Sequence, residues 1–198
     1  MYSSRGGLIL GFHGCDATVG ESILAGKTSL RPSDNDYDWL GPGMYFWEGC
    51  PRRALQFAHE VACLNRRVSR GAINKPFVLG AVIDPGHCCD LQSRESLEEV
   101  ARAHGFLSAL LGDQAIALPK NTIGEDGKLR RLDCAVIRMM HRLREVEHLP
   151  AYDSVRGAFW EGGPLYPGAG FSAKQHIQIS VLSPDRILGF FRPRLLVH

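Results

Sequence analysis

The sequence has no long apolar run and no excess of one charge. No apolar stretch reaches the roughly 18–20 residues that a membrane-spanning helix needs. Lys and Arg number 23 and Asp and Glu 21, a formal net charge of +2, so the composition does not indicate a polyanion-binding protein, although a local basic patch is allowed. The N-terminal stretch Met-Tyr-Ser-Ser-Arg-Gly-Gly has one Arg, and the apolar run behind it stops at His13, which argues against a secretory signal. We therefore expect a cytoplasmic protein without a membrane segment.

Cysteine pairs at zinc-site spacing are also missing. The cysteines lie at positions 15, 50, 63, 88, 89 and 134, and none forms a Cys-x-x-Cys pair. Cys88 and Cys89 follow His87, but neighbouring side chains on a strand point to opposite faces, which disfavours a shared metal ion. In a chain of 198 residues without a signal, reduced thiols are favoured over disulfides. We predict no metal site.

The chain does contain enough apolar residues to form one hydrophobic core. Hydrophobic residues make up 44% of the sequence, and no repeat, low-complexity tract or linker divides it, so we expect a single domain over 1–198. Short apolar runs bounded by turn residues predict strands. The predicted strands cover 8–12, 44–47, 77–83, 157–160, 176–182 and 187–191.

Helical spacing and capping residues place the helices. Asp16 or Thr18 suits the cap of a short helix over 20–25, and Pro51 suits the first position of the next, which extends through Val61. Ser96 with Glu99 forms a capping box before a helix that ends near residue 111. A further helix is predicted over 130–147 from its apolar stripe.

Two charged clusters have alternative interpretations. Asp34, Asp36 and Asp38 lie in a turn-rich segment, where acidic residues commonly serve as caps and turns. Arg131, Arg138 and Arg142 share the outer side of the helix over 130–147. That side is either solvated surface or a docking face for nucleic acid or an acidic partner.

Three polar residues lie within short apolar segments that we expect to be buried strands. His13 ends the run Gly-Leu-Ile-Leu-Gly-Phe-His, Tyr45 lies within Met-Tyr-Phe, and Gln178 lies within His-Ile-Gln-Ile-Ser-Val. A buried polar side chain needs a hydrogen-bond partner. Together the three predict a pocket for one polar ligand.

The segments around these residues share a known pattern. Residues 12–14 read Phe-His-Gly, and residues 41–46 read Gly-Pro-Gly-Met-Tyr-Phe, followed by a helical segment that contains Phe57. In this order they resemble the His and Gly-x-Gly-x-Tyr-Phe motifs of the ADP-ribosyltransferase superfamily, in the branch shared by poly(ADP-ribose) polymerases and diphtheria-toxin-like enzymes. That branch carries a His-Tyr-Glu triad on three strands. The first two members here would be His13 and Tyr45.

The third motif of the family is a Glu that opens a strand, followed by an apolar run and a Pro-containing turn. The segment 178–187 fits this spacing when Gln178 takes the Glu position. Gln175 is the competing choice, although the Pro-containing turn then falls out of register. The Gly/Pro-rich loop 161–170 lies where the family has its substrate-recognising loop. The resemblance covers about 8–62 and 155–192, and the segment 88–150 is expected to be a helical elaboration.

The resemblance implies a fold and a ligand. The fold would be α+β, a split antiparallel sheet around an NAD cleft. His13 would hydrogen-bond the adenosine-side ribose, and Gly14 would grip the nicotinamide carboxamide through its backbone, since glycine permits close approach. Tyr45 and Phe57 would sandwich the nicotinamide ring, where stacking adds roughly 0.5–1.5 kcal/mol. Gln178 would bind the nicotinamide ribose.

Gln178 in place of Glu changes the expected chemistry. Charged hydrogen bonds contribute roughly 1.5–3 kcal/mol against about 1 for neutral ones, a difference of about tenfold to a hundredfold in rate. Gln cannot act as a general base, so the acceptor must be intrinsically nucleophilic or activated by another residue, with Glu161 and Asp153 as candidates. We expect transfer of a single ADP-ribose unit and no chain elongation.

The implied activity is therefore mono-ADP-ribosyl transfer from NAD to RNA, DNA or protein. Tyr166 and Phe171, with the arginine face, offer stacking and phosphate contacts to a nucleic acid, whereas the low net charge equally allows a protein acceptor. The resemblance suggests a bacterial toxin or phage-defence effector, restrained by a cognate antitoxin. The rival class is a catalytically weak or inactive NAD-binding module of the same fold.

Overall fold

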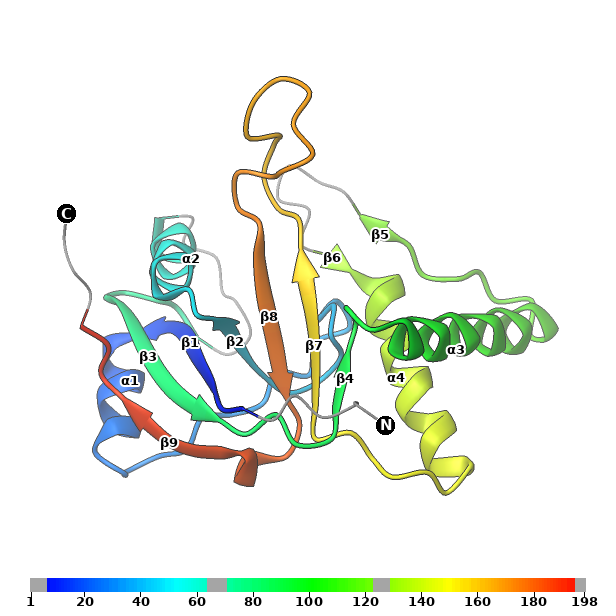
Figure 1. Cartoon of the computed structure of the whole chain (residues 1–198), viewed down its shortest axis with the longest axis horizontal. Helices are drawn as coiled ribbons and strands as arrows, with labels where there is room; N and C mark the ends of the chain where they lie inside the picture. The colour runs from blue at the N-terminus through cyan, green and yellow to red at the C-terminus, as the bar shows by residue number, and fades with distance from the viewer. Residues whose placement is uncertain (1–6, 64–70, 123–128, 195–198) are drawn as a thin grey trace.

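A computed structural model describes residues 7–63, 71–122 and 129–194 of the chain. Four α-helices in this part of the chain accompany one large sheet and a small two-stranded one (Figure 1). The helices are α1 (Ala17–Leu24), α2 (Pro51–Cys63), α3 (Arg94–Asp113) and α4 (Arg131–Val146). The strands are β1 (Ile9–Asp16), β2 (Met44–Glu48), β3 (Pro76–Ile83), β4 (Cys88–Asp90), β5 (Asn121–Thr122), β6 (Leu129–Arg130), β7 (Ser154–Phe159), β8 (His176–Val181) and β9 (Ile187–Phe191).

The large sheet has the strand order β4-β7-β8-β2-β1-β3-β9. All neighbouring pairs are antiparallel except β4 and β7, which are parallel. A mostly antiparallel sheet with helices packed on it is compatible with the predicted α+β class. The finer assignment, an ADP-ribosyltransferase fold, stays a prediction.

Strand β1 pairs over different lengths with its two neighbours, β3 and β2. The β1–β3 ladder extends from Ile9 to Asp16, the whole length of β1. The β1–β2 ladder joins only Gly11 to Glu48 and Phe12 to Trp47. The sheet therefore opens between β1 and β2 directly after Phe12, so that a gap in the backbone pairing, which we call the split, begins beside His13.

Register defines which side chains share a face, because residues opposite each other on antiparallel strands point to the same side. Trp47 lies opposite Gln178, which lies opposite Gly157. Helix α2 covers this face through Ala54, which packs with Trp47. Helices α3 and α4 cover the same face farther along, over Val155 of β7. Figure 1 shows α2 and the α3–α4 pair on the two sides of β8 and β7. We call this side the helix-covered face.

The segment predicted to be an elaboration is part of the sheet as well as its cover. β4 extends the sheet beyond β7. Helices α3 and α4 form the largest buried cluster with the edge strands, and Met140 and Cys89 are both fully buried in it. The middle of the chain therefore closes one end of the core.

Two predicted boundaries in the N-terminal part need correction. β1 passes the predicted end at residue 12 and continues to Asp16, because its full length pairs with β3. α1 begins at Ala17, not near residue 20, since Asp16 caps the helix by accepting the Thr18 N–H at 2.9 Å. The apolar run 77–83 becomes β3, an interior strand that pairs with β1 on one side and with β9 on the other.

Two later boundaries also differ. The capping residue of α3 is Ser93, whose hydroxyl accepts the N–H of Ser96, so the predicted capping box starts three residues too late. β7 begins at Ser154, ahead of the predicted residue 157, because β4 and β8 both pair with it from there. The predicted first helical residue Pro51, the helix over 130–147 and the last two strands agree with the structure within a residue or two.

Candidate active site

His13 spans the split between β1 and β2 with its side chain. Its Nδ1 lies 2.8 Å from the carbonyl oxygen of Tyr45. Because a carbonyl only accepts, Nδ1 carries the proton and Nε2 of the neutral ring is a bare acceptor. Desolvation by burial lowers the pKa of His13, despite the opposing effect of this hydrogen bond, so the ring is neutral at pH 7. His13 thus contacts the backbone of Tyr45, while the side chains of the two residues point to opposite faces of the sheet, His13 toward Phe46 and Tyr45 toward the helix-covered face.

Gly14 is required by helix packing. A Cβ on Gly14 would lie 2.3 Å from the carbonyl oxygen of Ala54 and 3.4 Å from the Cβ of Ala58, both on α2. The missing side chain therefore lets α2 approach β1 at the split. The predicted contact of Gly14 with a carboxamide stays a prediction. It would involve the backbone N–H and carbonyl of Gly14, which the packing of α2 does not concern.

Tyr45 holds the loop that precedes it. Its hydroxyl donates to the Gly41 carbonyl at 2.7 Å and accepts the Leu40 N–H at 2.9 Å. The ring packs against the cluster formed with α3 and α4 and is only partly buried. Desolvation by burial raises the pKa of Tyr45 well above its ordinary value, so the phenol is neutral. Tyr45 thus fixes the loop beside the site, and its predicted stacking on nicotinamide stays a prediction.

Gln178 lies on the helix-covered face of β8, two strands from β1. It is opposite Trp47 of β2 in the ladder. Its Oε1 accepts the indole N–H of Trp39 at 2.7 Å, which fixes the direction of the side-chain amide. Gln175 precedes β8 and is exposed. The strand geometry therefore favours Gln178 over Gln175 for the third position.

A row of rings crosses the helix-covered face, and the sequence argument found only one of its members. The rings of Phe57 and Trp47 are tilted at 45° with their centroids 5.0 Å apart, and the centroids of Trp47 and His176 lie 6.0 Å apart. His176 lies 5.3 Å from Phe159, which lies 4.7 Å from Trp39. The row ends at the indole that binds Gln178. The aromatic partner that the structure gives Phe57 here is Trp47.

Arg53 is a buried charged residue of the site that the sequence argument missed. It is 6% exposed, stands 5.7 Å over the Trp47 ring and pairs with Glu161 at 2.6 Å. A second pair, Lys174 with Glu60 at 2.6 Å, ties the other end of the β7–β8 loop to α2. Figure 1 shows this loop projecting beyond the ends of β7 and β8. An Arg at the third position of a helix carried no sequence signal, because such residues usually face solvent.

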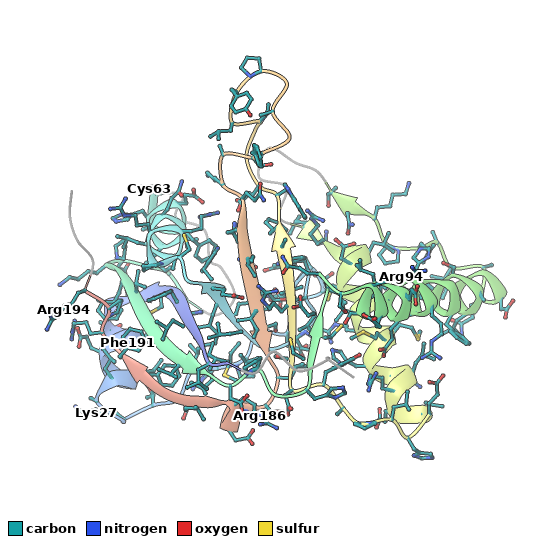
Figure 2. All side chains as sticks on the ribbon, in the orientation of Figure 1. Lys27, Cys63, Arg94, Arg186, Phe191 and Arg194 are labelled. Carbon is teal, nitrogen blue, oxygen red and sulfur yellow. The ribbon has the colours of Figure 1, made fainter. Side chains whose placement is uncertain are left out.

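The two candidates for acceptor activation differ in placement. Asp153 accepts the His87 N–H at 2.7 Å and pairs with Arg186 at 3.0 Å, at the start of β7 and away from the β7–β8 loop. Figure 2 labels Arg186 at that end of the sheet. Asp153 is therefore a structural residue. Glu161 lies at the site, in the ion pair with Arg53.

The arginine face of α4 meets the acidic cluster. Arg131 pairs with Asp36 at 2.9 Å, and Arg138 pairs with Asp34 at 2.6 Å. Asp38 instead accepts hydrogen bonds within its own loop. Two of the predicted outer arginines thus hold the loop that carries Trp39, and their charges are matched there.

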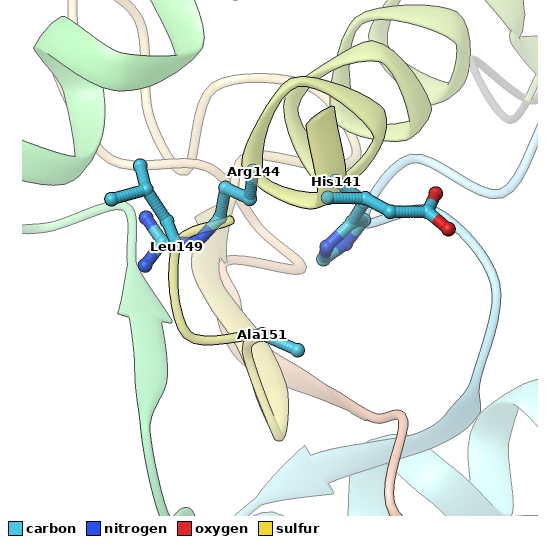
Figure 3. A pocket seen from close by; sticks show the side chains of 5 residues that line it. His141, Arg144, Leu149 and Ala151 are labelled. Carbon is cyan, nitrogen blue, oxygen red and sulfur yellow. The ribbon is translucent and has the colours of Figure 1, made fainter. Parts of the chain in front are cut away.

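A separate hollow of about 430 Å³ lies beside the end of α4 (Figure 3). Its lining includes His141 and Arg144. Arg144 donates to Glu99 at 2.7 Å and to the Pro150 carbonyl at 2.8 Å, and Tyr152 donates to the same carboxylate at 2.6 Å. Arg144, Glu99 and Tyr152 thus satisfy one another, whereas the buried Nε2 of His141 has no hydrogen-bond partner.

Metal and membrane features complete the description of the site. In residues 7–63, 71–122 and 129–194, no three His, Cys, Asp or Glu side chains are grouped in a way that would hold a metal ion. Within the same part of the chain, no helix has the length and apolar character needed to span a membrane. Comparison of the chain with protein-family models, curated proteins and solved structures gave no match.

Proposed function

We propose that the protein is an NAD-dependent mono-ADP-ribosyltransferase, which breaks the nicotinamide–ribose bond of NAD and transfers ADP-ribose to RNA, DNA or protein. The observation that carries the proposal is the position of His13. At the split, where the β1–β2 ladder has ended, its imidazole takes the place of a backbone N–H of β1 and donates a hydrogen bond to the Tyr45 carbonyl. The bare Nε2 is then an acceptor for a ribose hydroxyl of the dinucleotide.

The backbone of Gly14 supports the same ligand. The Leu10 carbonyl accepts the Gly49 N–H, so Leu10 directs its backbone groups toward β2. Backbone direction alternates along a strand, so Phe12 and Gly14 direct theirs the same way. The β1–β2 ladder ends at Phe12, which leaves the peptide groups of Gly14 facing the split. An N–H and a carbonyl on one edge complement the oxygen and amine of a carboxamide.

Gln178 supports a slow, single transfer. The Trp39 indole N–H donates to the side-chain carbonyl of Gln178. The amide nitrogen of Gln178 can therefore donate to a ribose hydroxyl. No carboxylate stands at this position to stabilise the positive charge that develops on the ribose. Its neutrality also favours one rival, a module that binds NAD without cleaving it.

The test is incubation of the full chain with NAD labelled on its adenylate half. Separate pools of RNA, DNA and lysate protein serve as acceptors, and free nicotinamide is measured beside label in each pool. We expect nicotinamide release and label in one pool. Substituting Ala for His13 should lower both signals at least tenfold, because the ribose loses its acceptor, while His104→Ala on the exposed side of α3 should leave them unchanged.

Two results would count against the proposed enzymatic activity. Release of no nicotinamide, with no label in any pool, would refute it. Binding of NAD measured by calorimetry under those conditions would support the non-catalytic module instead.

The biological role is suggested by the family resemblance. A transferase of this kind would act inside a bacterial cell as a toxin or phage-defence effector under control of an antitoxin. Induced expression should then arrest growth, and the His13→Ala variant should not. Normal growth with active protein present in the cells would exclude the toxin role.

A further inference from the structure

Unpartnered polar atoms collect beside Gln178, on the helix-covered face. They are the indole Nε1 of Trp47, Nε of Arg53 and Nε2 of His176, and none has a hydrogen-bond partner. Nη1 of Arg53 also lacks a hydrogen bond, but it pairs with Glu60 at 3.8 Å. The three residues are 5%, 6% and 7% exposed, so solvent does not satisfy these atoms. They come from β2, α2 and β8.

The three side chains form one group. The Arg53 guanidinium lies 5.7 Å from the centre of the Trp47 ring, and the Trp47 and His176 rings lie 6.0 Å apart. A buried polar atom without a partner destabilises the fold, and buried polar groups in proteins are otherwise almost always satisfied. Several such atoms on neighbouring side chains indicate a place that a ligand completes.

His176 has a defined tautomer. Its Nδ1 lies 2.6 Å from the Lys174 carbonyl, so Nδ1 carries the proton and Nε2 is a bare acceptor. Burial lowers the pKa of His176, and the Arg53 charge lowers it further, so the ring is neutral near pH 7. The charged groups around it are Arg53 of α2 and Glu161 of the β7–β8 loop, with the Lys174–Glu60 pair behind them.

The position of His176 fits a role in transfer. It lies two residues before Gln178 on β8, so both side chains point to the same face about 6.6 Å apart along the strand. A ribose held by Gln178 would have its reacting carbon within one side-chain length of His176. A nucleophile approaching that carbon from the β7–β8 loop would meet the bare Nε2.

We propose that His176 is the general base that takes the proton from the acceptor, a role that rests on the proposed function. The acceptor Nu–H attacks the anomeric carbon of the nicotinamide ribose as the carbon–nitrogen bond breaks. The bonding pair leaves with nicotinamide, which becomes a neutral pyridine. The proton of Nu–H passes to Nε2 of His176 and then to solvent, so one proton is released for each transfer.

The neighbours of His176 restrict the acceptor to an uncharged N–H or O–H group. A Lys or Arg side chain carries only donors, so it would leave the N–H groups of Trp47 and Arg53 without an acceptor. A carboxylate has no proton to give. Hydroxyl, amide or ring N–H groups flanked by carbonyl or hydroxyl oxygens satisfy the whole set, because those oxygens accept from Trp47 and Arg53 while the N–H or O–H donates to His176.

The test separates transfer from bond cleavage. In the labelled-NAD assay, His176→Gln keeps a donor for the Lys174 carbonyl but provides no base. We expect label transfer to fall by about 10²–10⁴-fold, the usual contribution of general-base catalysis, while nicotinamide release to water falls less than threefold. His104→Gln on α3 is the matched control. The RNA, DNA and protein pools identify which macromolecule supplies the acceptor group.

The pH profile gives a second readout that does not depend on a variant. The ratio of transfer to total nicotinamide release should rise with pH through the lowered pKa of His176 and then level off. Taking the ratio cancels the titration of His13, which affects both steps. A flat ratio, or equal loss of transfer and release in His176→Gln, would overturn the role of His176. Absence of nicotinamide release from the unaltered protein would instead refute the proposed function itself.

Discussion

Arg156 gives the sharpest test of how the sheet is held together. It is 1% exposed on β7, and its guanidinium donates to Glu48 at 2.5 Å, to both oxygens of Asp90 at 3.0 Å, and to Gln92 at 2.7 Å. These partners lie on β2, β4 and the turn after β4, so one side chain ties strands on both sides of β7. We predict that Arg156→Met, which keeps the aliphatic bulk, destabilises the protein because it removes the buried guanidinium that pairs with Glu48 and Asp90.

The magnitude follows from the burial of the partners. Breaking a buried ion pair costs roughly 3–5 kcal/mol. Glu48 and Asp90 keep 21% and 25% of their side-chain surfaces exposed, which lets water reach them after the change, so we expect the lower end, about 3 kcal/mol. For a chain of this size that corresponds to a fall in Tm of about 6–12 °C. Urea unfolding followed by circular dichroism measures the free energy directly.

The control is the same substitution in an exposed pair. Arg94 meets Glu98 at 2.7 Å on α3, but the two side chains are 87% and 63% exposed, so Arg94→Met should cost less than about 0.5 kcal/mol. If both variants unfold within 1 kcal/mol of each other, the Arg156 network is not what holds β7 to its neighbours, and the reasoning from burial fails.

Two further predictions concern residues near the split. Tyr45→Phe removes the hydroxyl to which the Leu40 N–H donates. We expect the free energy of unfolding, measured in urea, to fall by about 1–3 kcal/mol. A change near zero would show that the loop keeps its conformation without this hydrogen bond. The pKa of Asp16 is lowered by its hydrogen bonds, first from the Thr18 hydroxyl and then from the Lys75 N–H, so the folded state favours the carboxylate. Its stabilisation is therefore present above the ordinary Asp pKa of about 3.9 and is lost as the pH falls below it. The stability gap between the natural chain and Asp16→Ala should narrow from pH 6 to pH 3, and a gap that stays constant over that range would refute this linkage.

Local signals in the sequence were sufficient for much of the secondary structure. Pro51 begins α2 as expected, and the apolar stripe of 130–147 becomes α4. The predicted boundaries were wrong where contacts with other strands, or a second capping residue, determined where the element begins or ends. β1 continues to Asp16 because β3 pairs along it, and the α3 cap moved to Ser93 because two serines three residues apart offered equivalent signals.

The site was predictable in part. The pattern around His13, Tyr45 and Gln178 places them on β1, β2 and β8, and the strands do lie side by side in the order β8-β2-β1. The pattern could not show that the Tyr45 hydroxyl would hold its own loop, or that Trp39, far away in the sequence, would bind Gln178. Arg53 and His176 gave no sequence signal, because only burial distinguishes them from surface residues of the same type.

The sequence by itself determined which segments form strands and helices, since apolar periodicity and capping act over a few residues. It also determined which polar side chains those strands carry. Only the tertiary structure decided that the β1–β2 ladder ends at Phe12, that α2 packs on Gly14 and that unpartnered atoms of Trp47, Arg53 and His176 come together. The physical reason is that each of these features is a contact between elements distant in the chain, and the free energy of such a contact depends on the whole packed arrangement.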